Sequence, residues 1–190
     1  MTIRRLGLIA SLVLVAPHAG AQRPYETITI SGAGLRNLEY GLLADGWTAR
    51  DGWQVGLDTP FELGTLSAVV GRVGYDGSPG RPAYTATLLL GGVGTRPQRL
   101  GPLRASVGVR FGSYRMRFDD PDIDPGLRNE NEMIVLGAAR LDLSLGGGLS
   151  LFGDASTGAL LLSTRTRMTF AAAGAAYTMR TPRWLGTLLK

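Results

Sequence analysis

The sequence contains no cysteine, one histidine (His18) and one lysine (Lys190) among 190 residues. Without cysteine the chain can form no disulfide, thiol nucleophile or thiolate zinc site. No stretch after residue 21 approaches the roughly 18–20 consecutive apolar residues of a transmembrane helix. The length suits a single domain. These absences exclude thiol chemistry and a helical membrane protein before any motif is considered.

The N-terminus has the three parts of a secretory signal peptide, so we expect one over residues 1–21. Arg4 and Arg5 carry the positive charge, residues 6–15 form a short apolar stretch, and residues 19–21 (Ala-Gly-Ala) supply the small residues for cleavage. A buried N-terminal helix is the alternative. Cleavage after residue 21 removes His18, and a chain without imidazole or thiol cannot perform His-dependent acid–base or triad chemistry. We therefore predict that the protein is not an enzyme.

Further along the chain, apolar and polar residues alternate with a period of two, the pattern of a β-strand with two unlike faces. Residues 141–145, for example, read Leu-Asp-Leu-Ser-Leu. The pattern predicts eight strands, at about 37–45, 53–58, 61–76, 84–91, 104–111, 132–145, 149–156 and 168–179. They place a β-barrel over residues 36–179, between an N-terminal leader at 22–35 and a C-terminal extension at 180–190. Residues 27–31 within the leader are a candidate ninth strand.

Short and long connections take turns between these segments. The connections after the even strands lie at about 59–61, 96–101 and 146–148, and two of these three are tight. Those after the odd strands lie at about 46–50, 77–81, 119–130 and 163–166, and 119–130 is the single long loop. Antiparallel neighbours with length concentrated at one rim predict an all-β, up-and-down barrel of about eight strands.

Alternation alone does not say which face points outward, because a soluble barrel hides its apolar face and a membrane barrel shows it to lipid. A soluble protein usually coats itself with lysine and glutamate, and this chain has one lysine. The polar face carries charges of both signs that can pair inside a narrow lumen. These predicted lumen charges are Glu39, Asp58, Glu62, Arg72, Arg104, Arg110, Arg140, Asp142 and Asp154.

Aromatic residues also favour a transmembrane barrel, since most fall near predicted strand ends, where interfacial girdles lie. They are Tyr40, Trp47, Trp53, Tyr75, Tyr84, Phe118 and Phe170. An eight-stranded barrel is just wide enough for its own side chains. We therefore expect its charges to form a closed ion-pair network, with a diffusion pore as the alternative.

At this point the chain resembles the small outer-membrane β-barrel proteins of the OmpA/OmpX type. Residues 174–179 (Gly-Ala-Ala-Tyr-Thr-Met) resemble the Gly-x-x-aromatic-x-hydrophobic signal by which the barrel-assembly machinery reads the last strand. The resemblance implies a Gram-negative outer membrane, with the short connections toward the periplasm and 119–130 toward the exterior. The extension at 180–190, and Ala172 where that signal expects a polar residue, depart from the family pattern. Outer-membrane enzymes of this size class rely on histidine with serine, which the cleaved chain cannot provide.

The long loop is the most chemically suggestive feature outside the strands. Asp120, Asp122 and Asp124 offer oxygen ligands at a spacing that suits Ca²⁺, within the acidic segment 119–132. The EF-hand pattern fails, because Pro125 follows the third acid and Asn131 stands at position twelve. A looser Ca²⁺ site is the hypothesis, and a solvated surface loop is the alternative.

We predict a monomeric, non-enzymatic barrel in the outer membrane, with a structural or surface-interaction role and no cofactor. Its expected contacts are outer-membrane lipid, lipopolysaccharide and the barrel-assembly machinery. Nucleic acid is not expected, because the arginines are spread over strands without a binding motif. The alternatives are a soluble periplasmic or secreted barrel that binds an apolar ligand, and a small diffusion pore.

Overall fold

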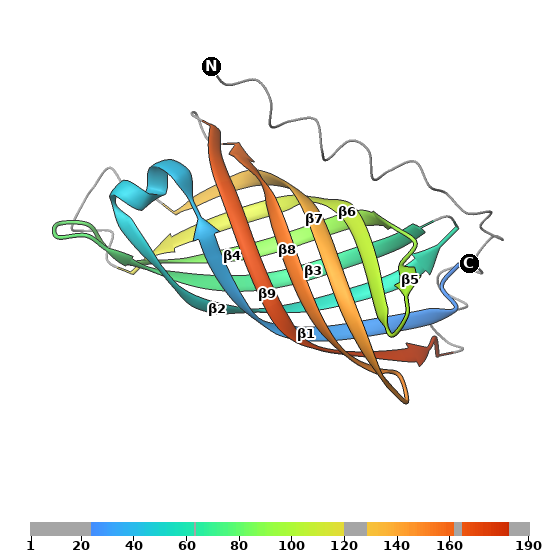
Figure 1. The fold of residues 1–190 in the computed structure, drawn as a ribbon. Coiled ribbons are helices and arrows are strands. Elements are labelled where there is room, and N and C mark those ends of the chain that lie inside the picture. Colours follow the sequence, from blue (N-terminus) through green and yellow to red (C-terminus); the bar gives the residue numbers. More distant parts are fainter. Residues whose placement is uncertain (1–23, 63, 120–128, 162–164, 183–190) are drawn as a thin grey trace, which may run out of the picture.

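The computed structural model describes residues 24–62, 64–119, 129–161 and 165–182 (Figure 1). The chain runs through β1 (Thr27–Glu39), η2 (Gly41–Asp45), β2 (Trp47–Phe61), β3 (Gly64–Gly77), β4 (Tyr84–Thr95), β5 (Gln98–Leu100), β6 (Leu103–Phe118), β7 (Glu130–Gly146), β8 (Leu149–Leu161) and β9 (Arg165–Arg180). Eight of these strands are long, β5 has three residues, and η2 is a 3-10 helix of five residues. No helix in the described part of the chain has the length and apolarity to cross a membrane.

The eight long strands close into a barrel. Each pairs antiparallel with its neighbours in the chain, and β1 also pairs with β9 from Thr27, opposite Arg180, to Glu39. The pairing of β4 with β6 passes over β5, so the circle has no open edge. The predicted all-β, up-and-down barrel of eight strands is confirmed.

The first strand lies earlier in the chain than predicted. Residues 27–39 form β1, so the expected leader at 22–35 overlaps the barrel, and much of the expected strand at 37–45 is the 3-10 helix η2. Gly32 and Gly34 face outward in the middle of β1 and carry no side chain, which interrupts the apolar alternation in the sequence. The strand is nevertheless fixed, because it bonds to β2 and β9 at once.

The two ends of the barrel differ. Thr27, Arg180 and the connections after β2, β4 and β7 lie at one end, here called the terminus end. The connections after β1, β3, β6 and β8 leave from the other, here called the loop end (Figure 1). At the terminus end, Gly146, Gly147 and Gly148 all have positive φ (94°, 59° and 86°), which glycine adopts at little cost in the tight β7–β8 turn.

The outer wall is apolar over much of its area. Leu141, Leu143 and Leu145 of β7 point outward with exposed fractions of 45%, 37% and 52%. The outward positions of β2 and β6 carry Trp53, Val55, Leu57, Val107, Val109 and Phe111. In these strands the apolar face of the sequence pattern is the outer face.

In strands β3, β4 and β9 the apolar face of the sequence pattern is instead the inner face. The apolar residues that define their alternation point inward and are buried, as Val73 and Tyr75 show in β3, Leu88 in β4 and Phe170 in β9. In β4 both faces are apolar, since Leu89 between two buried leucines is 61% exposed. A period of two fixes which residues share a face, and the orientation of that face comes from what fills the lumen.

Candidate functional site

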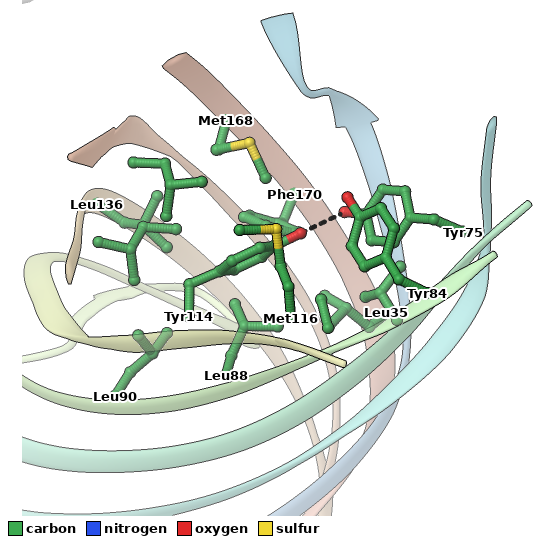
Figure 2. Close-up of a cluster of buried hydrophobic side chains, with 14 of the residues drawn as sticks. Leu35, Tyr75, Tyr84, Leu88, Leu90, Tyr114, Met116, Leu136, Met168 and Phe170 are labelled. Atoms are coloured by element: carbon green, nitrogen blue, oxygen red, sulfur yellow. Dashed lines mark hydrogen bonds between the residues drawn. The ribbon is translucent and has the colours of Figure 1, made fainter. Parts of the chain in front are cut away.

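The interior of the barrel has two layers of different chemistry. The layer at the loop end is an apolar plug, in which side chains from several strands point toward one another (Figure 2). We define the apolar plug as Val73, Tyr75, Tyr84, Tyr114, Ile134, Leu136, Leu160, Met168 and Phe170, each at most 2% exposed. These side chains fill this part of the lumen as a protein core is filled.

Three tyrosines fix the geometry of the plug. The rings of Tyr75 and Tyr84 stack with centroids 4.4 Å apart and planes 7° apart. The Tyr75 hydroxyl accepts a hydrogen bond from Asn37 Nδ2 at 2.5 Å and another from the Tyr114 hydroxyl at 3.1 Å (Figure 2). The buried hydroxyls of Tyr75 and Tyr114 are therefore paired inside the plug, as a low-dielectric interior favours.

Aromatic residues continue the plug to the loop end. Trp47 packs edge-on against Tyr84 at 5.5 Å, and its Nε1–H donates to the Pro82 carbonyl at 2.9 Å. Phe118 lies 5.3 Å from Tyr84. The prediction that these aromatic residues form an interfacial girdle is wrong for Trp47, Tyr75, Tyr84, Phe118 and Phe170, which are buried inside the barrel. Trp53 is 48% exposed on the outer wall.

The second layer lies toward the terminus end and consists of ion pairs. We call Asp58, Arg110, Arg140, Asp142 and Asp154 the ionic layer. Arg110 holds Asp154 with two parallel hydrogen bonds, Nη1 to Oδ1 at 2.8 Å and Nη2 to Oδ2 at 2.6 Å. Their side chains are only 12% and 4% exposed. This fork geometry is the strong form of an arginine–carboxylate pair.

Arg140 joins two further carboxylates across the lumen. Its Nη1 lies 3.3 Å from Asp58 Oδ2, and its Nη2 lies 2.9 Å from Asp142 Oδ1. The guanidinium also lies over the Phe152 ring, 3.9 Å from its centroid. One cation thus has two anionic partners and an aromatic face, and the ionic layer as a whole holds two arginines against three carboxylates.

The structure brings five of the nine predicted lumen charges together in the ionic layer. Arg104 lies outside this layer and lines the wide mouth of the lumen at the terminus end. Glu39, Glu62 and Arg72 are not lumen residues. A β-bulge between Asn37 and Glu39 turns Glu39 outward, where it pairs with Arg167 at 3.3 Å. Glu62 is exposed in the β2–β3 turn, and Arg72 lies on the outer face of β3.

A hollow of about 670 Å³ lies at the terminus end of the lumen, and Asp58, Arg140 and Asp142 of the ionic layer contribute to its lining. Its lining includes the arginines Arg99 and Arg104, which stand directly opposite each other between β5 and β6. Hydroxyl side chains such as Thr29, Ser106 and Ser150 complete the wall. The interior is therefore a polar vestibule, an ionic layer and an apolar plug in series.

The predicted calcium ligands lie outside the described residues. Asp120, Asp122 and Asp124 therefore remain a prediction, as do the signal peptide at 1–21 and most of the extension at 180–190. Within the described ranges no group of three or more His, Asp or Glu side chains is placed to hold a metal ion. The alternation of the sequence did not predict the apolar plug, although apolar residues on both faces of β4 are a signal of inward packing.

No protein-family model and no characterised protein matches the sequence. Solved structures with a similar fold are bacterial outer-membrane barrels. The outer membrane protein OprG of Pseudomonas aeruginosa aligns with a TM-score of 0.61 at 8% identity, over 83% of this chain and 98% of OprG. Neisserial surface protein A aligns with a TM-score of 0.57 at 11% identity, over 84% of this chain and 99% of that protein. The N-terminal β-barrel domain of Pseudomonas aeruginosa OprF aligns with a TM-score of 0.53 at 11% identity, over 83% of this chain and 100% of that domain. The chain has the fold of the small eight-stranded outer-membrane barrels.

Proposed function

We propose that this protein is a non-enzymatic outer-membrane β-barrel that acts through its surface and not through its lumen. The observation that carries the proposal is that apolar side chains cover the outer wall and charged pairs lie inside, the reverse of the arrangement in a water-soluble protein. Large apolar side chains such as Leu89 and Leu141 are exposed on the wall, while charged pairs such as Arg110–Asp154 are buried in the lumen. Water stabilises neither arrangement, whereas a lipid bilayer around a filled barrel stabilises both.

The filled interior supports a role other than transport. The apolar plug is buried between eight strands, and the ionic layer lies beneath it. An ion moving through the lumen would have to displace both. A structural role, or binding of an external partner by the loop at 119–130, is consistent with this arrangement.

The chemistry of the chain supports the absence of enzymatic activity. The sole histidine lies in the predicted signal peptide, and there is no cysteine. The buried carboxylates of Asp154 and Asp142 are engaged by arginines at 2.6 Å and 2.9 Å, so neither is free to act as a general base.

The proposed orientation places the terminus end in the periplasm and the loop end outside the cell. The Gly174–Met179 segment would then lie at the end of the last strand, where the barrel-assembly machinery would bind it. The proposed state is a monomer in contact with outer-membrane lipid and lipopolysaccharide. Closure of β1 on β9 supports the monomer, because no described long strand has an unpaired edge that requires a second chain.

Membrane fractionation of cells that produce the protein tests the location, together with electrophoresis of heated and unheated samples. We expect recovery with the outer membrane and a shift in migration on heating, because a closed barrel resists detergent until it is boiled. Recovery in the soluble periplasm without such a shift would favour the soluble barrel with an apolar ligand. Stable conductance of the native protein in planar bilayers would favour the pore.

A further inference from the structure

Arginines gather on the outer wall of the barrel near the loop end. The exposed ones are Arg36, Arg50, Arg72, Arg115, Arg117, Arg165 and Arg167. Three of them have acidic partners, namely Asp51 for Arg36 at 3.6 Å, Asp76 for Arg50 at 3.4 Å and Glu39 for Arg167 at 3.3 Å. Arg72, Arg115, Arg117 and Arg165 form no ion pair with any residue that the structure describes, and the first three of these lie together.

Arg72 on β3 and Arg115 and Arg117 on β6 lie close together, with β4 between the two strands. Arg72 stands directly opposite Thr87, and Thr87 stands directly opposite Arg115. Arg117 is two residues further along β6, opposite Thr85. Two strand spacings put the Cα atoms of Arg72 and Arg115 about 10 Å apart. Three flexible cations can therefore reach one ligand. We call Arg72, Arg115 and Arg117, together with Thr85 and Thr87 between them, the basic patch.

The basic patch borders the apolar part of the wall. The next outward positions toward the terminus end are Val70, Leu89 and Met133, which are 40%, 61% and 51% exposed, with Ser113 between the last two. Trp53 stands opposite Arg72, the position of an interfacial aromatic residue. The patch thus begins where the hydrocarbon-facing surface ends.

An arginine at this depth needs an anionic partner. A guanidinium beside hydrocarbon is costly, and its long side chain reaches toward the interface to find polar groups. The acids that neutralise Arg36, Arg50 and Arg167 have no counterpart among the described residues around Arg72 and Arg115. Lipid phosphates are the anions at that depth, and arginine binds phosphate with two parallel hydrogen bonds.

We propose that the basic patch is a binding site for the phosphate groups of an anionic outer-leaflet lipid of the lipid A class, a phosphorylated glucosamine lipid. Arg72, Arg115 and Arg117 would bind the phosphates, and Thr85 and Thr87 would donate hydrogen bonds between them. The acyl chains would lie along Val70 and Leu89 below. The inference rests on the proposed function, because it places the loop end in the outer leaflet.

Native mass spectrometry of the refolded full chain in detergent micelles tests the site, with bisphosphoryl lipid A as the probe. We expect the native protein to retain lipid A in preference to phosphatidylcholine. The variant R72Q/R115Q/R117Q should bind it at least roughly tenfold more weakly, which corresponds to about 1.4 kcal/mol. The matched variant R36Q/R50Q/R167Q removes the same charge from β1, β2 and β9 and should change binding by less than about twofold, because each of these arginines already has an acidic partner and exposed ion pairs contribute little.

Equal weakening by both variants would reduce the effect to net charge and overturn the site, as would no weakening by either. Displacement of lipid A by an equal concentration of inorganic phosphate would overturn the assignment to a lipid. If the triple variant does not fold, lipid A binding is measured for the single variants R72Q and R115Q, and for the native protein at increasing salt concentration. We expect each single variant, and added salt, to weaken binding. Binding that is insensitive to salt would then overturn the proposal.

Insertion into vesicles of phosphatidylcholine alone separates this inference from the proposed function. A protein that inserts there with heat-modifiable migration, yet shows no preference for lipid A, retains the proposed function and loses the basic patch as a lipid site. A protein that fails to insert loses the proposed function itself.

Discussion

At the scale of single residues, Tyr75 organises the apolar plug. Its hydroxyl accepts from Asn37 and from Tyr114, and its ring stacks on Tyr84 at 4.4 Å. The three residues that it contacts come from β1, β6 and β4. One buried side chain on β3 thereby links strands from different parts of the wall, and its polar tip is as important as its ring.

Removal of the Tyr75 hydroxyl should therefore destabilise the barrel more than removal of the Tyr114 hydroxyl. Tyr75→Phe leaves two buried donors without an acceptor and should lower the free energy of unfolding by about 1–3 kcal/mol, whereas Tyr114→Phe loses one bond and about 1 kcal/mol. Urea titration of the protein in lipid vesicles measures both. Tyr177→Phe on the outer wall is the control and should have no effect. A larger loss for Tyr114→Phe would contradict this role of Tyr75.

The Arg110–Asp154 pair should be far more sensitive to loss of one partner than to loss of both. Asp154→Asn leaves a buried guanidinium without its bidentate carboxylate and should cost about 3 kcal/mol of unfolding free energy. The double variant Arg110→Met/Asp154→Leu removes the charge altogether and should recover much of that loss, since well-packed apolar side chains replace buried ion pairs at little cost. Denaturant unfolding of the native protein and of these two variants measures the difference, and a double variant less stable than Asp154→Asn would contradict this expectation.

Single residues also show where sequence reasoning reaches its limit. Asp58, Arg110, Arg140, Asp142 and Asp154 were named from the polar face of predicted strands, and the barrel brings these five together. The pairs Arg110–Asp154 and Arg140–Asp58 join distant parts of the chain, so no local pattern predicts them, whereas Arg140 and Asp142 are two residues apart on β7. Glu39 was misplaced because one extra residue in a bulge reverses the face that follows it.

At the scale of strands, glycines on β8 have two different roles. Gly158 faces the interior, and a Cβ there would collide with the backbone carbonyl oxygen of Val135 on β7. Gly153 faces outward, and a Cβ there meets nothing within 4 Å. Close approach of backbone therefore requires glycine at one position, while the other has open space around it.

Substitution of these two glycines by alanine should separate the roles. Gly158→Ala should force β7 and β8 apart and lower the free energy of unfolding by about 1–3 kcal/mol. Gly153→Ala adds one methyl group to the outer wall and should change the free energy by less than about 0.5 kcal/mol. Unfolding titrations in vesicles, with the migration of unheated protein as a check on folding, measure both. Equal stability of the two variants would contradict the close approach at Gly158.

Strand positions were predictable to different degrees for a physical reason. At residues 140–145 of β7 exposed leucines alternate with charged and polar residues, so both the strand and its orientation follow from the sequence. In β4 both faces carry leucine, and the strand is recognisable while its orientation is not. The first strand was predicted too late in the chain, because glycine occupies outward positions of β1 that other strands fill with apolar side chains.

At the scale of the whole molecule, two barriers lie in series along the barrel axis. The apolar plug excludes water at the loop end, and the ionic layer occupies the lumen beside the vestibule. The plug is the tighter of the two, because its members are at most 2% exposed whereas Arg140 and Asp58 retain exposed fractions of 13% and 22%.

Removal of the plug should convert the barrel into a channel. The variant Tyr75→Ala/Tyr114→Ala/Phe170→Ala empties the apolar layer, and water that enters from the loop end then meets a polar ionic layer. We expect single-channel events in planar bilayers for this variant and a silent bilayer for the native protein. The control is Leu141→Ala/Leu143→Ala/Leu145→Ala, which removes comparable apolar volume from the outer wall. A silent plug variant that still migrates as a folded barrel would show that the ionic layer alone closes the lumen.

The sequence by itself determined the class of fold, the number of strands, the alternation of short and long connections, and which residues share a face. These properties follow from local chemistry, since backbone geometry alternates side chains and glycine and proline mark turns. Only the tertiary structure decided which face of β3, β4 and β9 points inward, that aromatic residues fill the lumen, and how the charges pair. Those outcomes depend on closure, because the space left inside a barrel exists only once β1 has paired with β9 and β4 with β6.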